Sequence, residues 1–326
     1  MKKSFFIIIV GLVAFSCANN NLFIDGTVEG LASGKVYLQK FVNKKYILID
    51  SAVISEGKFK FAAKAELPEI YGLTLDTLKS SYMLFLDENP VKVALDTSRY
   101  SRDTKVEGSA LQDLFTDYQK NQNDVKIDEF IKAHPASLVS AYVLYRNFAY
   151  RLTPDEIRAN IALLDSRLLN TQYVKILEKL VVTLEAVSIG KHAPDFTLNT
   201  PEGKPVSLSD KLGKGYVLVD FWAAWCGPCR YENPNVVAAY NKYKEKGFDI
   251  VGVSLDFDKA AWEKAIEKDS LTWTHISDLK YWENEAAALY GIRAIPSNVL
   301  IDNEGVIVAK NLRGEDLDAK LEEYLN

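Results

Sequence analysis

The chain has 326 residues, 48% of them hydrophobic, and a formal net charge of −5. This length exceeds one ordinary domain and suffices for two buried cores, so we expect at least two domains. The acidic balance and the lack of a basic stripe argue against a nucleic-acid-binding protein, and beyond the N-terminal run no apolar stretch approaches the ~20 residues of a membrane-spanning helix.

The N-terminus has the pattern of a lipoprotein signal peptide, expected over residues 1–17. Lys2 and Lys3 precede an apolar stretch, 5–15, that is too short to cross a bilayer. Small residues near Cys17 suit processing at that cysteine, which would then carry lipid and hold the protein on a membrane surface. The alternative is ordinary cleavage nearby, which leaves Cys17 as a free thiol. Loss of Lys2 and Lys3 would change the formal charge from −5 to −7.

Residues 22–106 show the periodicity of short strands separated by turns. The expected strands lie near 36–38, 46–49, 58–61, 83–86 and 91–95. Short strands at this spacing are typical of an antiparallel β-sandwich or small barrel. The segment holds no paired carboxylates, metal-spaced histidines or nucleophile motif, so we expect this β-rich domain to be non-catalytic.

The period changes to helical over 109–188, which we interpret as a helical spacer. Thr153-Pro154-Asp155-Glu156 is a capping box with proline at the first helical position. Aromatic side chains recur at helical spacing, as in Tyr142 and Tyr145. Such a stripe predicts a packed core or interdomain contact rather than a ligand site.

Residues 190–326 alternate between strands and helices, which predicts an α/β sheet domain. The stretch 217–222 is almost wholly apolar, as a buried central strand should be. Helices are expected near 228–246, 259–268, 283–290 and from about 316, with strands near 196–198, 206–208, 250–255, 273–276, 297–301 and 306–309.

The strongest chemical signal is the pair Cys226 and Cys229. The chain has only three cysteines, and a Cys-x-x-Cys at a strand-to-helix junction is typical of a redox dithiol. Cys226 would lie just before a helix, where free N–H groups and the helix dipole favour the thiolate, so it is the expected nucleophile. Cys229, one turn further on, would resolve the mixed disulfide. No cofactor is expected besides this dithiol.

Two separated segments of this domain resemble thioredoxin. Residues 217–230, with Trp-Cys-Gly-Pro-Cys, resemble its active-site segment, and residues 290–296 resemble its cis-proline loop. The segment 193–196, the turn at 202–203 and the additional stretch 256–278 resemble the membrane-tethered bacterial branch called TlpA/ResA-like. The resemblance implies a thioredoxin-like fold for 190–326. The preceding residues resemble the β-rich domain and helical spacer of some lipoproteins of this branch.

The resemblance also implies roles for single residues. Pro296 matches the cis-proline that faces the dithiol, and Ile295 would offer its backbone to an extended substrate segment. Trp225 would shield the dithiol, and Asp220 matches the buried carboxylate that helps move the proton of the second cysteine. A structural pairing is the alternative for Asp220. Thioredoxin has a lysine on the next central strand, but residues 250–254 contain none, so the proton affinity of Asp220 should differ from that of thioredoxin.

Three other functions are alternatives to disulfide exchange. Zinc binding would need about four ligands, whereas His134, His192 and His275 are scattered along the chain. A peroxiredoxin would carry a lone peroxidatic cysteine, so a thiol peroxidase is the second choice of enzyme. The third alternative is a membrane-anchored binding protein with a secondary redox domain.

The expected function is therefore an envelope thiol-disulfide oxidoreductase that faces the periplasm. Gly227, Pro228 and Ile295 resemble reducing thioredoxin more than the oxidant DsbA, so reduction of protein disulfides is the favoured direction. A reductase in an oxidising compartment needs a membrane electron donor, here of the DsbD or CcdA type. Apocytochrome thiols of cytochrome c biogenesis, misoxidised proteins and other redox carriers are all open as substrates.

Overall fold

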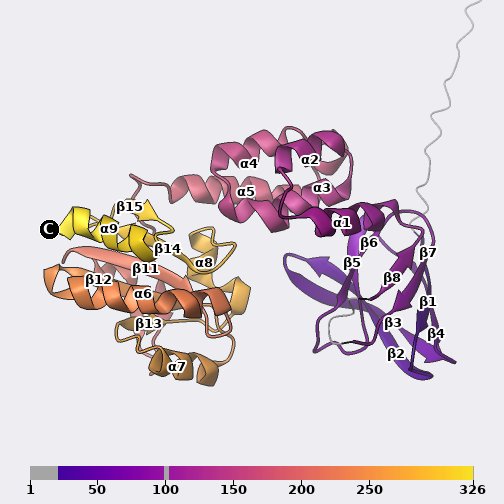
Figure 1. Cartoon of the computed structure of the whole chain (residues 1–326), viewed down its shortest axis with the longest axis horizontal. Coiled ribbons are helices and arrows are strands. Elements are labelled where there is room, and N and C mark those ends of the chain that lie inside the picture. Colours follow the sequence, from indigo (N-terminus) through magenta and orange to yellow (C-terminus); the bar gives the residue numbers. More distant parts are fainter. Residues whose placement is uncertain (1–20, 99–102, 326) are drawn as a thin grey trace, which may run out of the picture. The chain divides into compact units, whose positions relative to one another are not determined.

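The computed structural model describes residues 21–98 and 103–325, so the expected signal peptide and Cys17 lie outside the described residues. The chain forms two compact units that divide after Asp124 (Figure 1). The expected domain limits near 106–109 and 188–190 stay predictions. Among the helices of the described ranges, none is both long and apolar enough to cross a bilayer.

The first unit is built on one curled sheet of eight strands with the order β6-β5-β2-β3-β4-β1-β7-β8. Its strands are β1 (Asn21–Val28), β2 (Ser33–Val42), β3 (Lys45–Ser55), β4 (Lys58–Lys64), β5 (Glu69–Thr74), β6 (Tyr82–Leu86), β7 (Val91–Leu95) and β8 (Lys105–Glu107). The predicted β-rich class is confirmed. One pairing differs from the antiparallel expectation, because β1 and β7 run parallel.

Buried and exposed side chains alternate along these strands, and the buried ones form the core of the first unit. Phe59 and Phe61 on β4 are buried while Lys58 and Lys60 are exposed, as expected for a sheet with one buried face. Helix α1 (Ala110–Asn121) packs beside β6. The hydroxyl of Ser109 donates to the carbonyl oxygen of Phe85 at 2.7 Å, and the N–H of Phe85 donates to Oε1 of Gln112 at 2.9 Å. These bonds attach α1 to the sheet.

The second unit begins with helices α2 (Ile127–Ala133), α3 (Leu138–Val143), α4 (Pro154–Ile161) and α5 (Gln172–Ala186). A π-helical turn, η1 (Leu144–Phe148), and a 3-10 turn, η2 (Ala149–Arg151), connect α3 to α4. The predicted capping box is confirmed, since Thr153 and Glu156 bond to each other's backbone N–H. Tyr142 and Tyr145 are buried and pack on Tyr173, as the packing interpretation predicts.

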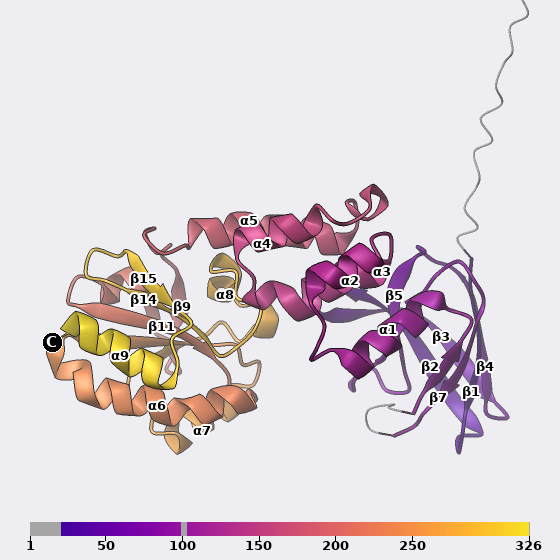
Figure 2. The ribbon, with the colours of Figure 1, turned by 45° about the horizontal axis from the view of Figure 1, so that its top comes forward.

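The rest of this unit is a five-stranded sheet of order β13-β12-β11-β14-β15 (Figure 2). Its strands are β11 (Tyr216–Trp222), β12 (Phe248–Ser254), β13 (Thr274–Ile276), β14 (Ser297–Ile301) and β15 (Ile307–Lys310). The central strand β11 pairs parallel with β12 and antiparallel with β14. It is buried almost throughout, which explains its apolar sequence. A hairpin of β9 (Thr197–Asn199) and β10 (Pro205–Ser207) precedes it.

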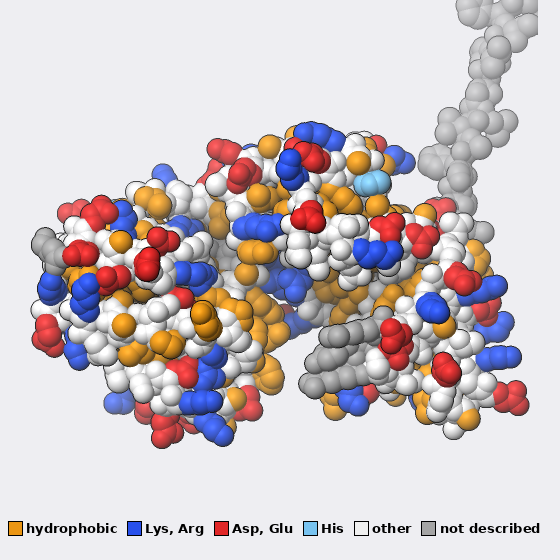
Figure 3. Space-filling view, in the orientation of Figure 1, with side chains coloured by type: hydrophobic (Ala, Val, Ile, Leu, Met, Phe, Trp, Pro, Cys, Tyr) orange, Lys and Arg blue, Asp and Glu red, His pale blue; other side chains and the backbone are white. Residues whose placement is uncertain are grey.

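Four helices accompany the sheet: α6 (Gly227–Tyr243), α7 (Lys259–Lys268), α8 (Glu285–Leu289) and α9 (Gly314–Leu325). Helices α6 and α9 lie side by side in both ribbon views and are joined by an ion pair between Lys242 and Asp318 at 2.9 Å. On the face drawn in Figure 3, acidic and basic side chains are interspersed over the surface of this unit, with hydrophobic side chains between them.

Candidate active site

The two cysteines lie where β11 passes into α6. Cys226 is the N-cap of α6, and the backbone N–H of Cys229 donates to its Sγ at 3.1 Å. The two residues are joined by a disulfide, and both are buried. The helix start therefore gives the Cys226 sulfur both a directed N–H donor and the positive end of the helix dipole, which is the arrangement that stabilises a thiolate after reduction.

A second segment approaches the same sulfur atom. The peptide bond between Ile295 and Pro296 is cis, as the resemblance implies, and the carbonyl oxygen of Ile295 lies 3.6 Å from Sγ of Cys226. A groove of about 790 Å³ opens beside this contact and is lined by Gly227, Pro228 and the segment 294–297, among others. An extended peptide entering the groove would meet the backbone of Ile295 next to the reactive sulfur.

Trp225 stands beside the dithiol and is partly exposed. Its indole N–H donates to the carbonyl oxygen of Leu255 at 3.3 Å. Its ring packs on those of Tyr281 and Trp282, with centroid distances of 5.0 and 6.0 Å. The aromatic side chain is thus held in place at the edge of the site, where it can shield the dithiol from water.

Asp220 is buried on the central strand. Removal from water raises the pKa of its carboxyl to about 7; the positive charge of Arg313 opposes this rise and the negative charge of Glu232 adds to it. A carboxyl with this pKa can take up and release a proton near neutral pH. Its predicted part in moving the proton of Cys229 stays a prediction.

A histidine lies on the side of Asp220 where thioredoxin has a lysine on the next strand. Asp220 lies beside Gly252 on β12, and Gly252 lies beside His275 on β13. A Cβ on Gly252 would come within 2.4 Å of Nδ1 of His275, so the imidazole fills the space above the glycine. Burial lowers the pKa of His275 to about 3, so the ring is neutral. A neutral histidine stands on this side of Asp220 instead of a cation.

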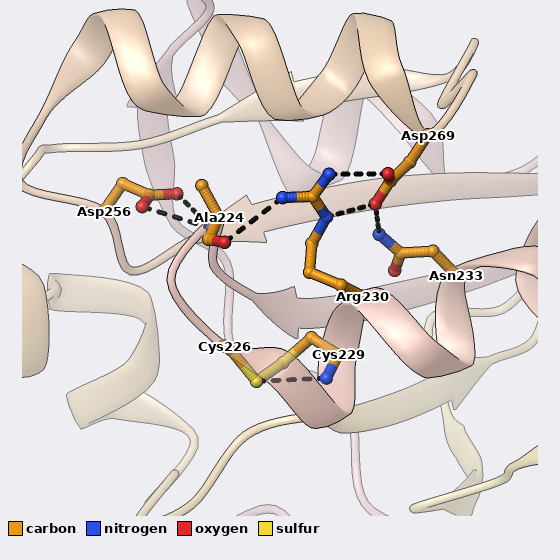
Figure 4. Close-up of polar contacts among 7 residues, drawn as sticks. All are labelled: Ala224, Cys226, Cys229, Arg230, Asn233, Asp256 and Asp269. Atoms are coloured by element: carbon orange, nitrogen blue, oxygen red, sulfur yellow. Dashed lines mark hydrogen bonds and ion pairs between the residues drawn. A yellow bond between two sulfur atoms is a disulfide. The ribbon is translucent and has the colours of Figure 1, made fainter.

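The loop that carries Cys226 is held by a network that sequence reasoning missed (Figure 4). The N–H of Ala224 donates to both carboxylate oxygens of Asp256, at 2.9 and 3.2 Å, and its carbonyl oxygen accepts from Arg230 at 3.2 Å. Arg230 also forms a two-pronged ion pair with Asp269, which accepts a further bond from Asn233 at 2.6 Å. We call these four side chains the Ala224 clamp: Arg230, Asn233, Asp256 and Asp269.

The position of one clamp residue, Asp256, could be predicted from the sequence. Asp256 follows the end of β12, and the carboxyl ends of neighbouring parallel strands meet at one edge of a sheet, which is also where Cys226 follows β11. Asp269 has no such signal, because the cap of α7 reaches Arg230 only through packing.

Arg313 and Glu232 are two further charged residues at the site. Arg313 donates to the carbonyl oxygen of Pro296, and Glu232 accepts from the N–H of Gly314 at 2.7 Å. Both side chains line the groove and both act on the pKa of Asp220. They therefore link the cis-proline loop, the start of α9 and the buried carboxyl.

Comparisons with known proteins match the part of the chain that contains this site. The profile of the AhpC/TSA family matches residues 189–310, and that of a domain of unknown function, DUF4369, matches residues 23–115. The fold is confirmed as a thioredoxin-like domain that follows a β-rich domain and helices. A thioredoxin domain of a thiol-disulfide oxidoreductase from Bacteroides vulgatus has 44% identity and a TM-score of 0.40, and the match covers 43% of this chain and 99% of that one.

Curated relatives carry the same designation. The thiol-disulfide oxidoreductase ResA of Bacillus thuringiensis subsp. konkukian is 36% identical over 141 residues, which are 43% of this chain and 79% of that protein. ResA of Bacillus subtilis is 31% identical over 142 residues, or 44% of this chain and 76% of that protein. With its disulfide-linked Cys226 and Cys229 and this identity over most of the relative's length, the chain belongs to the thiol-disulfide oxidoreductases of the ResA family.

Proposed function

We propose that this protein reduces disulfides of proteins in the cell envelope. The observation that carries the proposal is the Cys226 sulfur, which lies at the start of α6, accepts the N–H of Cys229 and faces the cis-proline loop. In the reduced enzyme the Cys226 thiolate attacks a substrate disulfide, forms a mixed disulfide and releases one substrate thiolate. Cys229 then attacks Cys226, releases the second thiolate and closes the disulfide.

The second step needs a base for the Cys229 thiol. Asp220 is the proposed acceptor, because its raised pKa of about 7 lets it bind that proton near neutral pH. The closed disulfide must afterwards be reduced again. A membrane protein of the DsbD or CcdA type is the proposed electron donor, and lipid on Cys17 would keep the enzyme beside it at the membrane, facing the periplasm.

A thiol peroxidase is the alternative enzyme. It would use a lone thiolate to attack a peroxide, whereas Cys226 here is paired with Cys229 across a single turn of α6. The paired arrangement supports exchange between disulfides.

A trapping experiment in cells tests the proposal. A full-length Cys229→Ser protein should attack a substrate disulfide once and stall as a stable mixed disulfide, because the resolving thiol is gone. Cys226→Ser is the matched control and should trap nothing. With Cys17 intact the uncomplexed protein should be found in the membrane fraction, and a Cys17→Ser, Cys229→Ser double variant should release the uncomplexed protein from it.

The outcomes separate the parts of the proposal. Capture by Cys226→Ser and none by Cys229→Ser would exchange the two roles. No capture by either variant would argue against protein disulfides as substrates. Uncomplexed protein that stays in the membrane fraction without Cys17 would argue against the lipid anchor.

A further inference from the structure

One wall of the groove beside the dithiol comes from outside the α/β sheet region. Tyr150 and Arg151, which belong to the turn η2, line it together with Gly227, Pro228 and the segment 294–297. The helical segment of this unit therefore contributes side chains to the surface that a substrate meets. This inference rests on the proposed function, because it concerns how that groove selects a substrate.

Packing between the helices and the loop that follows α8 fixes this wall. Gly291 has a φ of 66°, and a Cβ there would lie 3.1 to 3.3 Å from side chains of α5. The guanidinium of Arg293 lies over the ring of Tyr145 on η1 at 4.7 Å. Lys310 donates to the carbonyl oxygen of Val187 at 3.2 Å. The ribbon views show α5 and α8 as neighbours (Figures 1 and 2). The chain from Gly291 to Pro296 thus runs from this contact directly to the dithiol.

The charged side chains that line the groove differ in how exposed they are and in whether they already have a hydrogen-bond partner. The carboxylate of Glu232 accepts from the N–H of Gly314 and from the side chain of Asn235, and Arg313 donates to the carbonyl oxygen of Pro296. Both are partly buried, whereas Arg151 is exposed. The guanidinium of Arg151 lies 4.3 Å from the ring centroid of Phe148 and 5.8 Å from that of Tyr150. Within 21–98 and 103–325, its contacts are with these rings and no carboxylate pairs with it.

Two aromatic rings hold this cation in place without neutralising it. The groove thus combines a backbone edge at Ile295, an apolar ring at Tyr150 and an exposed positive charge at Arg151. We propose that Tyr150 and Arg151 select extended, disulfide-bearing polypeptide segments that carry an acidic side chain close to the attacked cysteine. The opposite charge of such a segment complements Arg151, and its backbone can lie along the cis-proline loop.

A single-turnover reaction isolates this selection. The full-length protein is first reduced with excess dithiol, which is then removed. Two peptides of equal length each carry one cysteine as a mixed disulfide with thionitrobenzoate, and they differ only in a Glu or a Lys two residues from the cysteine. Attack by the Cys226 thiolate on the peptide sulfur forms the enzyme–peptide disulfide and releases coloured thionitrobenzoate. Cys229 then displaces the peptide thiol, so that the enzyme dithiol is oxidised and the reagent disulfide reduced.

The wild type should attack the Glu peptide faster than the Lys peptide. Arg151→Gln should lower the rate for the Glu peptide roughly threefold, and Arg151→Glu should lower it roughly tenfold and speed attack on the Lys peptide, as expected for a partly exposed ion pair. Arg146→Glu is the matched control, since Arg146 is an exposed arginine on η1 that does not line the groove. Hydroxyethyl disulfide, a small uncharged disulfide, should react equally with all four proteins.

Tyr150→Ala provides a second measurement. Removal of the ring takes away the apolar wall, so attack on both peptides should slow while attack on the small disulfide stays unchanged. Circular dichroism of each variant checks that the helical segment is folded. The inference would be overturned if the charge of the peptide made no difference to the wild type, or if Arg146→Glu changed the rates as Arg151→Glu does. A wild type that attacks no disulfide at all would instead contradict the proposed function.

Discussion

At the scale of single residues, the buried carboxyl of Asp220 couples the stability of the protein to pH. Its pKa is about 7 in the folded protein against 3.8 for an unperturbed aspartate, because burial disfavours the charged form. Between these two values the folded protein holds a proton that the unfolded chain has lost. The free energy of unfolding therefore falls as the pH rises from about 4 to 7, and it stays low above pH 7.

We predict that Asp220→Asn removes this dependence. A difference of about three pKa units corresponds to about 4 kcal/mol, so the variant should gain up to that amount over the wild type between pH 4 and pH 8. Denaturant unfolding of the oxidised proteins, followed by tryptophan fluorescence, measures the gain. All five tryptophans lie after residue 190, so the signal reports on the thioredoxin-like domain.

Asp316→Asn is the control, since Asp316 is exposed on α9. It should leave the pH dependence as in the wild type. An Asp220→Asn protein whose unfolding free energy follows the pH exactly as the wild type does would show that Asp220 is ionised in the fold, which would remove it as the acceptor of the Cys229 proton.

Sequence reasoning found the residues whose chemistry is local. The Cys-x-x-Cys spacing identifies Cys226 and Cys229, and the sequence of the surrounding segment identifies Pro296. Arg313 and Asp269 could not be found in this way, because each reaches the site only through tertiary packing, at Pro296 and Arg230 respectively. Tyr150 and Arg151 belong to a segment whose helical pattern gave no sign of the groove that they line.

At the scale of secondary-structure elements, the Ala224 clamp connects the start of α6 with the end of α7. Arg230 and Asn233 lie on α6, and Asp269 is the C-cap of α7. The clamp holds the backbone of Ala224, two residues before Cys226, at its N–H through Asp256 and at its carbonyl oxygen through Arg230. It thereby keeps the Cys226 sulfur at the helix N-terminus, where the thiolate is stabilised.

We predict that Arg230→Met makes the dithiol more reducing. Without the clamp, the helix start stabilises the Cys226 thiolate less, so the reduced form loses stability relative to the disulfide. The loss of one charged hydrogen bond of roughly 1.5 kcal/mol corresponds to a fall of about 30 mV in the reduction potential. Equilibration with redox buffers measures it, and the pKa of Cys226 should rise in the same variant.

The conservative variant distinguishes positioning from bulk stability. Arg230→Lys keeps the charge but cannot reach both Asp269 and the Ala224 carbonyl with a planar fork, so its shift should be smaller than that of Arg230→Met. An Arg230→Met protein that is less stable but has the wild-type potential would show that the clamp serves only the fold.

Elements with a clear period or cap were predicted well, and others were not. Helix α7 spans Lys259–Lys268 as predicted, since Asp258 caps it with its side chain. Strand β5 was missed, because all of its residues, from Glu69 to Thr74, are buried and leave no alternation to read. In β1 the buried and exposed residues do alternate, but Asp25 and Gly26 weaken the pattern of a strand.

At the scale of the whole molecule, the helical segment lies between the β-rich unit and the redox site in the sequence. It also contributes Tyr150 and Arg151 to the groove beside that site. We predict that a fragment of residues 125–326 keeps the preference for an acidic peptide, and that a fragment of residues 189–326 loses it, because Tyr150 and Arg151 are gone. Both should reduce a small disulfide at the rate of the full chain. Retention of the charge preference in the shorter fragment would place the selecting residues in the sheet domain.

Whether this dithiol donates or accepts electrons depends on the reduction potential of the Cys226–Cys229 couple, which can be measured. The fluorescence of Trp225, next to the dithiol, can follow the equilibrium in redox buffers of known potential. We expect a value closer to the approximately −270 mV of thioredoxin than to the approximately −120 mV of DsbA. A potential near that of DsbA would contradict the proposed direction, because such a protein would oxidise thiols instead of reducing disulfides.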